Sequence, residues 1–195
     1  MNVLAMGTRL SDIQIGCLKT LIKYSWEGNE ISLVISGNPK GRKEKDSMSY
    51  SELKIDHVYF TERFDESTVT QENVNTLGSI IKKTKPSLVI LPFDKTKNKK
   101  RAVLAHSALL ACRGIKNILM YETTKNENFS PNVFFTFEKE SLNGLTEDRK
   151  LQINSTVKEI RKSIQKFHSS NIRIEKNTEA FESKRVLLLD ISEIA

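Results

Sequence analysis

The sequence has few of the residues that build covalent or thiolate-based sites. Only two cysteines occur among its 195 residues. Cys17 and Cys112 form no CxxC pair, and both fall in segments of helical period. The sequence therefore predicts neither a disulfide framework nor a thiolate metal site. We expect both cysteines to be small buried apolar residues.

Long apolar runs are also missing. No segment approaches the ~20 consecutive apolar residues that a membrane-spanning helix needs. The first residues already have the pattern of a strand, which argues against a secretory leader. We expect a cytoplasmic protein without a membrane anchor.

The length and charge of the chain suggest one domain with a basic surface. A chain of 195 residues suits a single domain, here residues 1–195, that buries roughly 70% of the surface of its unfolded form. The 31 Lys and Arg against 24 Asp and Glu give a net charge of +7, which suits an acidic partner. Most basic residues are dispersed, and only residues 95–101 form a cluster. This cluster has no interleaved aromatic residues and matches no nucleic-acid motif, which disfavours nucleic acid as the partner.

Short apolar runs alternate with segments of helical period, which is typical of βαβ units. This order predicts an α/β fold, a single Rossmann-like three-layer α/β/α sandwich with a mostly parallel sheet. The expected strands are residues 2–6, 31–36, 57–60, 87–91, 118–121 and 133–137. The expected helices follow Ile15, Leu18 and Ile22, then Val74, Leu77 and Ile81, then residues 102–112 and 153–167, with a short exposed helix through Tyr50 and Leu53.

The loops after the strands are the expected ligand side of this fold. In open α/β sheets, ligands bind beyond the carboxyl ends of the strands. The relevant loops are residues 7–14, 37–43 and 92–101, and the segment from residue 122 onward.

The first of these loops carries a motif. Residues 4–17 read LAMGTRLSDIQIGC. This segment resembles, without a gap, the pattern LAIGAHPDDIEIGC of the PIG-L/LmbE family, the zinc-dependent deacetylases of N-acetylated sugars. The motif's histidine falls on Arg9, its first aspartate on Ser11 and its second on Asp12. The resemblance implies that Arg9 and Asp12 stand at zinc-ligand positions and that Ser11 stands at the position of the general base.

A second motif of the family resembles residues 94–103. Its two histidine positions hold Lys97 and Lys100, and the aspartate between them is Lys99, so Lys100 stands at the remaining zinc-ligand position. Shorter matches extend the resemblance over nearly the whole chain. They are Lys85-Pro86, Ala111-Cys112-Arg113, Tyr121-Glu122, Phe129-Ser130-Pro131-Asn132, His168-Ser169-Ser170-Asn171 and Glu179-Ala180-Phe181-Glu182 with Arg185.

The replacements remove the zinc chemistry of the family. Zinc needs lone pairs from imidazole, thiolate or carboxylate groups, and an ammonium or guanidinium group has none to give. Asp12 alone cannot hold the ion. Without the metal, the pKa of the attacking water returns from about 7 toward about 15.7, and Ser11 cannot replace a carboxylate base. The sequence therefore predicts no bound zinc and no hydrolytic reaction, a pseudoenzyme.

The three histidines do not restore a metal site. His57 fits a surface or capping residue at a strand edge, and His106 fits a satisfied histidine on a helix, although its helix could bring it toward the site. His168 matches a family position near the pocket, where a hydrogen bond is as plausible as chemistry. A triad built on Ser11 and Asp12 is disfavoured because adjacent residues rarely converge and no G-x-S-x-G motif occurs.

Two interpretations of the cationic replacements remain open. In the first, Arg9 or Lys100 pairs with Asp12 and keeps the loop folded where the metal would lie. In the second, the cationic group binds an anion such as a phosphate, a carboxylate or a nucleotide sugar. The candidate ligand-binding residues are Arg9, Asp12, Lys97, Lys100, Arg101, Tyr121 and His168.

Two functions follow from these interpretations. The favoured one is a protein without deacetylase activity that binds a carbohydrate or anionic sugar derivative, or that partners an active enzyme of glycan biosynthesis. The resemblance also implies a homo-oligomer, because members of the family often form one. The alternative is an active N-acetyl-sugar deacetylase with non-standard active-site residues.

Overall fold

The computed structural model describes residues 1–37, 55–123, 128–136 and 178–184. Its strands are β1 (Asn2–Gly7), β2 (Glu30–Ile35), β3 (His57–Phe60), β4 (Leu88–Pro92), β5 (Ile118–Tyr121), β6 (Val133–Thr136) and β7 (Thr178–Lys184). Its helices are α1 (Leu10–Gly16), α2 (Leu18–Trp26), α3 (Gln71–Thr84) and α4 (Lys99–Ala111). The predicted helices at residues 50–53 and 153–167 lie outside the described residues.

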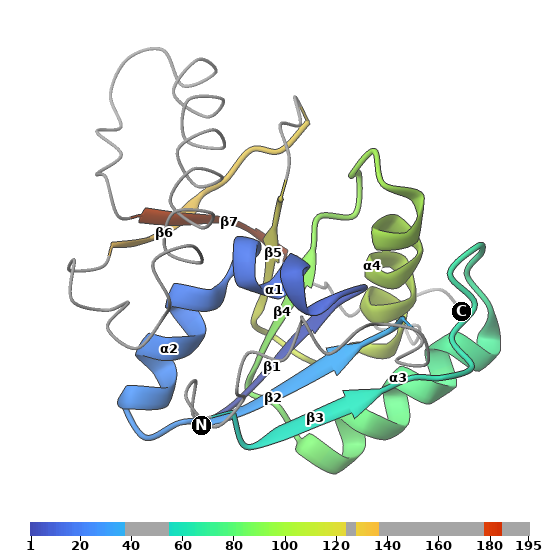
Figure 1. Ribbon diagram of the computed structural model, residues 1–195, viewed down its shortest axis with the longest axis horizontal. Helices are drawn as coiled ribbons and strands as arrows, with labels where there is room; N and C mark the ends of the chain where they lie inside the picture. The colour runs from blue at the N-terminus through green and yellow to red at the C-terminus, as the bar shows by residue number, and fades with distance from the viewer. Residues whose placement is uncertain (38–54, 124–127, 137–177, 185–195) are drawn as a thin grey trace, which may run out of the picture.

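The strands form one seven-stranded sheet in the order β3-β2-β1-β4-β5-β7-β6 (Figure 1). The first five strands in this order run parallel to one another. Strand β7 is antiparallel to both β5 and β6. The predicted mostly parallel sheet is confirmed, with the single antiparallel strand, β7, next to one edge.

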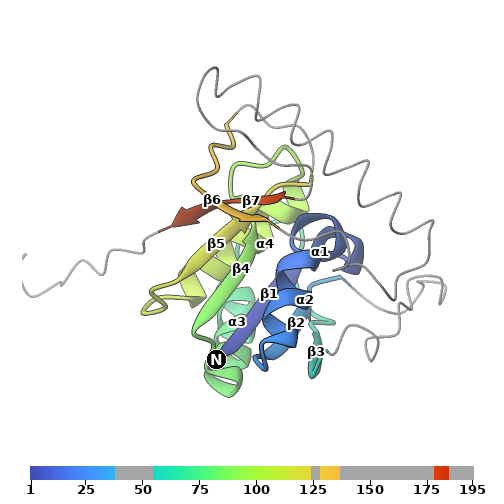
Figure 2. The ribbon, with the colours of Figure 1, turned by 90° about the vertical axis from the view of Figure 1, so that its left-hand side faces the viewer.

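Helices cover both faces of this sheet, as the predicted three layers require (Figure 2). On one face, α1 and α2 bury Leu10, Ile13 and Leu18 against alternate residues of the strands. On the other face, α3 and α4 bury residues such as Leu77 and Leu104 against the intervening residues. Because successive side chains of a strand point to opposite faces, the parallel strands read as continuous apolar runs. Each of these strands therefore contributes side chains to two hydrophobic cores, one on each face of the sheet.

The first helix differs from the prediction. The sequence predicts one helix through Ile15, Leu18 and Ile22, but two helices form, with Cys17 between them in a non-helical conformation (φ −153°, ψ 13°). Leu18 and Ile22 are buried, whereas Ile15 is half-buried. The break turns α2 relative to α1, so the apolar spacing across it does not describe one helix face.

The tail that matches the family's EAFE segment forms a strand that is not among the strands predicted from the sequence. In this strand, β7, the carboxylate of Glu179 accepts hydrogen bonds from the backbone N–H groups of Lys19 (2.9 Å) and Thr20 (2.9 Å) and from the Thr20 hydroxyl (2.7 Å). These N–H groups lie in the first turn of α2, where a helix leaves them without an internal partner. Glu179 therefore fixes β7 to the start of α2.

This buried carboxylate predicts a pH-dependent stability. Burial raises the pKa of Glu179 from 4.5 to about 7, against the hydrogen bonds of Thr20 and Lys19, which lower it. A carboxyl group with a higher pKa in the folded than in the unfolded chain contributes most stability below its ordinary pKa. We expect the free energy of unfolding to fall as the pH rises from 4.5 to about 7, and this component to be absent from Glu179→Gln. Denaturant titrations of both chains at the two ends of this range measure it, and a wild-type advantage that grows with pH would contradict it.

Two further expectations concern burial and the membrane. Cys17 and Cys112 are free and buried, as predicted. None of the helices in the described part of the chain has the length and apolar character to cross a membrane.

Candidate functional site

Asp12 is the centre of the polar contacts beyond the carboxyl end of β1. Its side chain is 2% exposed. One carboxylate oxygen, Oδ2, accepts hydrogen bonds from the Thr8 backbone N–H (3.1 Å), the Thr8 hydroxyl (2.6 Å) and the Arg9 backbone N–H (3.2 Å). A carboxylate on the N–H groups that lead into α1 satisfies donors at the start of the helix. Asp12 thus holds the loop between β1 and α1.

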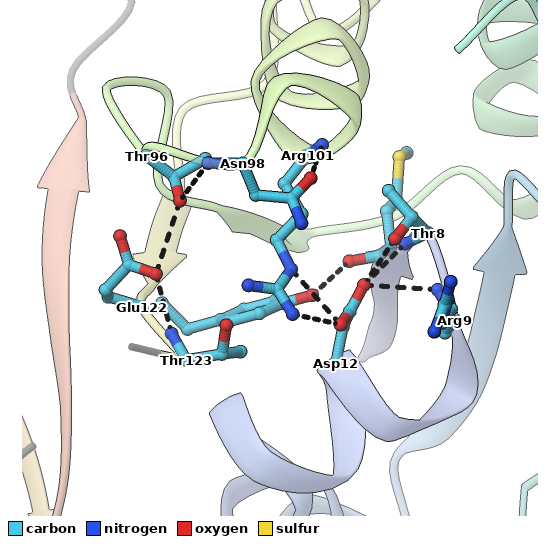
Figure 3. Close-up of polar contacts among 10 residues, drawn as sticks. Thr8, Arg9, Asp12, Thr96, Asn98, Arg101, Glu122 and Thr123 are labelled. Carbon is cyan, nitrogen blue, oxygen red and sulfur yellow. Dashed lines mark hydrogen bonds and ion pairs between the residues drawn. The ribbon is translucent and has the colours of Figure 1, made fainter. Parts of the chain in front are cut away.

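The other oxygen of Asp12 is paired with Arg101 from the first turn of α4 (Figure 3). Its Oδ1 lies 2.7 Å from Arg101 Nη2 and 3.1 Å from Arg101 Nε. The Arg101 side chain is 16% exposed, so this ion pair is partly withdrawn from water. Arg101 therefore supplies the positive charge beside Asp12 and ties α4 to the β1–α1 loop.

The prediction that Arg9 or Lys100 pairs with Asp12 is wrong, because the side chain that pairs with Asp12 is that of Arg101. Arg9 precedes α1 in an extended conformation, and it gives Asp12 its backbone N–H, whereas its side chain is exposed. Lys100 bonds to Glu66 at 2.6 Å on the outer side of the molecule. One residue along a helix rotates the side chain by about 100°. That rotation turns Arg101 toward Asp12 and Lys100 away from it.

Tyr121, at the end of β5, packs beside this ion pair. Its hydroxyl donates a hydrogen bond to the backbone oxygen of Met6 at 2.8 Å. Burial, and next the negative charge of Asp12, raises the pKa of Tyr121 well above its usual value, so the phenol keeps its proton. The ring lies against Gly16, where a Cβ atom would be 2.1 Å from Tyr121 Cδ2. Tyr121 therefore positions both the end of β1 and the end of α1.

Glu122 and Thr123 continue the site beyond β5. Glu122 is buried, and its Oε1 accepts from the Thr123 backbone N–H (2.8 Å) and from the Thr96 hydroxyl (3.5 Å). Thr96 belongs to the loop before α4, so this contact joins the loops that follow β4 and β5. In the sequence, Glu122 stands out only as part of a family match, and Thr8, Thr96 and Thr123 do not stand out by themselves. A threonine in a loop gives no periodic signal, so only the folded chain identifies these residues.

The other candidate residues are not gathered around Asp12. Lys97 and Lys99 are exposed near the start of α4, and Ser11 is half-buried on α1. His57 is an exposed residue 3.4 Å from Glu30, as expected for a surface histidine. His106 is exposed on α4. His168 lies outside the described residues.

The described residues of the site do not form a zinc-binding set. Both oxygens of Asp12 are engaged by five hydrogen bonds, two of them from a guanidinium group. A carboxylate presents about four lone-pair positions, so none of them is left for an ion. No group of three or more His, Cys, Asp or Glu side chains that could hold a metal occurs within the described ranges.

Comparison with known proteins identifies the fold. No family profile matches the chain, and no curated protein matches it by sequence. The conserved protein TT1542 from Thermus thermophilus has a TM-score of 0.68 at 15% identity, over 96% of this chain and 97% of its own. The N,N'-diacetylchitobiose deacetylase from Pyrococcus horikoshii has a TM-score of 0.65 at 17% identity, over 94% of this chain and 84% of its own.

These structures, with further deacetylases among the matches, are of the LmbE/PIG-L type. This chain has the LmbE/PIG-L fold. The resemblance that the sequence motifs indicated is confirmed at the level of the fold. The 4-carboxy-2-hydroxymuconate hydratase GalB from Pseudomonas putida also matches, with a TM-score of 0.63 at 13% identity over 93% of this chain and 95% of its own. The LmbE/PIG-L fold therefore does not determine one reaction. Function must therefore be argued from the site.

Proposed function

We propose that this chain is a zinc-free protein of the deacetylase fold that binds a carbohydrate or an anionic sugar derivative without removing an acetyl group. The observation that carries this proposal is the Asp12–Arg101 ion pair, in which a guanidinium group occupies the free oxygen of the carboxylate. An arginine side chain carries one permanent positive charge and no lone pair. It can balance the charge of Asp12, but it cannot activate a water molecule in the way that zinc does.

The charge around this pair supports an anionic ligand. Residues 95–101 hold four lysines and Arg101; Lys97 and Lys99 are exposed, whereas Lys100 is paired with Glu66. Arg9 is exposed on the neighbouring loop. Exposed cations beside a partly buried site raise the local concentration of anions and favour their binding. A sugar phosphate or a sugar acid fits this distribution better than a neutral glycan does.

The deacetylases among the structural matches support the sugar part of the proposal. One of them is an N,N'-diacetylchitobiose deacetylase, one is a deacetylase in complex with teicoplanin, and one is a deacetylase of the A40926 pseudoaglycone. The first of these names is that of an N-acetylated sugar. A chain that keeps this fold and loses the metal ligands can keep the binding of such a compound. It can bind the compound by itself or beside an active partner enzyme, as a homo-oligomer or in a mixed assembly.

Metal content and acetate release test the proposal directly. We expect the purified chain to hold only trace zinc by mass spectrometry, even after incubation with zinc and removal of the excess. We also expect no acetate from N-acetylglucosamine or N,N'-diacetylchitobiose with added zinc. One tightly bound zinc ion per chain together with acetate release would instead establish an active deacetylase with non-standard residues.

A further inference from the structure

One edge of the Arg101 guanidinium group is not used by Asp12. Nε and Nη2 donate to Asp12, and the third nitrogen, Nη1, has no partner among the residues that the structure describes. Figure 3 shows this nitrogen directed away from Asp12, to the side on which Thr96, Glu122 and Thr123 lie. The side chain keeps 16% of its surface exposed. Arg101 can therefore bind a ligand group without releasing Asp12.

The hydroxyl group of Thr123 lies on the same side. Thr123 is 5% exposed, and its Oγ1 is buried without a hydrogen-bond partner within the described part of the chain. In Figure 3 this oxygen points in the direction of the Arg101 guanidinium group. An unpaired buried hydroxyl costs about 1–3 kcal/mol, so such groups are normally satisfied by a bound molecule or by ordered water. Two unused polar groups thus point toward each other, one from α4 and one from the segment that follows β5.

The charges at this place decide which ligand group fits there. Arg101 can only donate, whereas the Thr123 hydroxyl both donates and accepts. The buried carboxyl group of Glu122 is next to Thr123, and its Oε1 accepts from the Thr123 backbone. A phosphate or carboxylate would bring a negative charge close to the carboxyl group of Glu122, which disfavours an anion at this place. A neutral hydroxyl group accepts from Arg101 and donates to Thr123, so it uses both groups without repulsion.

We propose that Arg101 Nη1 and Thr123 Oγ1 form a subsite for a neutral hydroxyl group of the sugar, and that the anionic group of the ligand lies outside it, toward the exposed lysines of residues 95–101. This assignment rests on the proposed function and adds the orientation of the ligand to it. The ion pair with Asp12 holds the guanidinium group in place, so the subsite is present before the ligand binds.

The chain offers a matched pair of substitutions to test the subsite. Thr123→Val replaces the unpaired hydroxyl with a methyl group of similar size. Thr61→Val makes the same change at another buried threonine whose hydroxyl has no described partner, in the loop that follows β3. Both variants should fold, because removing an unpaired buried hydroxyl is nearly neutral or stabilising. Thr123→Ser, which keeps the hydroxyl, and Thr123→Ala provide second variants if the valine is not accommodated.

Three probes separate the sugar hydroxyl from the anion, and calorimetry measures their affinities. They are N-acetylglucosamine, N-acetylglucosamine 6-phosphate and inorganic phosphate. We expect Thr123→Val and Thr123→Ala to weaken both sugars by the same factor, roughly fivefold to tenfold for one lost hydrogen bond, and to leave inorganic phosphate unchanged. We expect Thr61→Val and Thr123→Ser to bind like the wild type.

The outcomes distinguish the subsite from the function on which it rests. If the wild type binds both sugars and Thr123→Val does so as well as Thr61→Val, the subsite is wrong and the proposed function stands. If Thr123→Val also weakens inorganic phosphate, an anion occupies this place and the hydroxyl assignment is overturned. If the wild type binds neither sugar at millimolar concentration, the proposed function fails, and the subsite fails with it.

Discussion

Replacing Arg101 by alanine should lower the free energy of unfolding by about 3–5 kcal/mol, as the removal of one partner of a buried ion pair usually does. Asp12 is 2% exposed, and without Arg101 its Oδ1 would keep a negative charge with no counter-ion. The three remaining hydrogen bonds all reach Oδ2, so they cannot compensate for this loss. Urea denaturation followed by circular dichroism measures the difference.

The neighbouring residue provides the control for this experiment. Lys100→Ala removes a surface pair with Glu66, in which the lysine side chain is 57% exposed. Such pairs contribute about 0–1 kcal/mol, so this variant should be close to the wild type. Arg101→Lys keeps the charge but loses the two-nitrogen contact, and we expect it to lie between the two. Equal stability of Arg101→Ala and Lys100→Ala would show that the ion pair does not hold the site together.

Gly16→Ala should destabilise the chain by about 3 kcal/mol, at the upper end of the cost of overpacking a core. The new Cβ atom would lie 2.1 Å from Cδ2, 2.5 Å from Cγ and 2.6 Å from Cε2 of Tyr121. These atoms are close to the attachment of the ring, so Tyr121 cannot turn away without moving β5 or α1. We expect the hydrogen bond from Tyr121 to Met6 to be lost, together with part of the ligand affinity.

Another glycine in a helix shows what the same change does without a neighbour. At Gly78 in α3, an added Cβ atom would meet nothing within 4 Å. Gly78→Ala should therefore stabilise the chain by about 0.5–1 kcal/mol, because alanine loses less conformational freedom than glycine in a helix. Thermal denaturation of both variants is the measurement. A Gly16→Ala chain that melts at or above the wild-type temperature would contradict the close packing against Tyr121.

The structure bears on the first of the two interpretations of the cationic replacements, in which a cation pairs with Asp12. A cation does pair with Asp12 and holds the loop between β1 and α1, as the first interpretation requires. The cation is Arg101, and the side chains of Arg9, Lys97 and Lys99 are exposed. The anion-binding interpretation stays a prediction, which the proposed function includes.

The sequence by itself determined the fold class. It also determined five of the seven strands of the sheet to within a residue or two at each end. The sixth predicted strand, residues 133–137, agrees with the structure as far as the described residues reach. Alternating apolar runs are a local signal, and β3 and β5 were predicted with the bounds that the structure has. The sequence also determined which side of the sheet to examine, because Asp12 follows the first strand in a recognisable motif. It did not assign β7, because this strand pairs with β5 across a long separation in the chain and its residues, TEAFESK, have a mixed pattern.

Only the tertiary structure decided which cation reaches Asp12. Arg9 is nearest in sequence and Lys100 occupies the family's ligand position, yet the rotation of α4 brings Arg101 to the carboxylate from 89 residues away. The partners of Glu179 and the unused hydroxyl of Thr123 were decided in the same way. Composition and spacing report which charges are present, whereas the direction of each side chain depends on how helices and strands pack. The chemistry of this site follows from those directions.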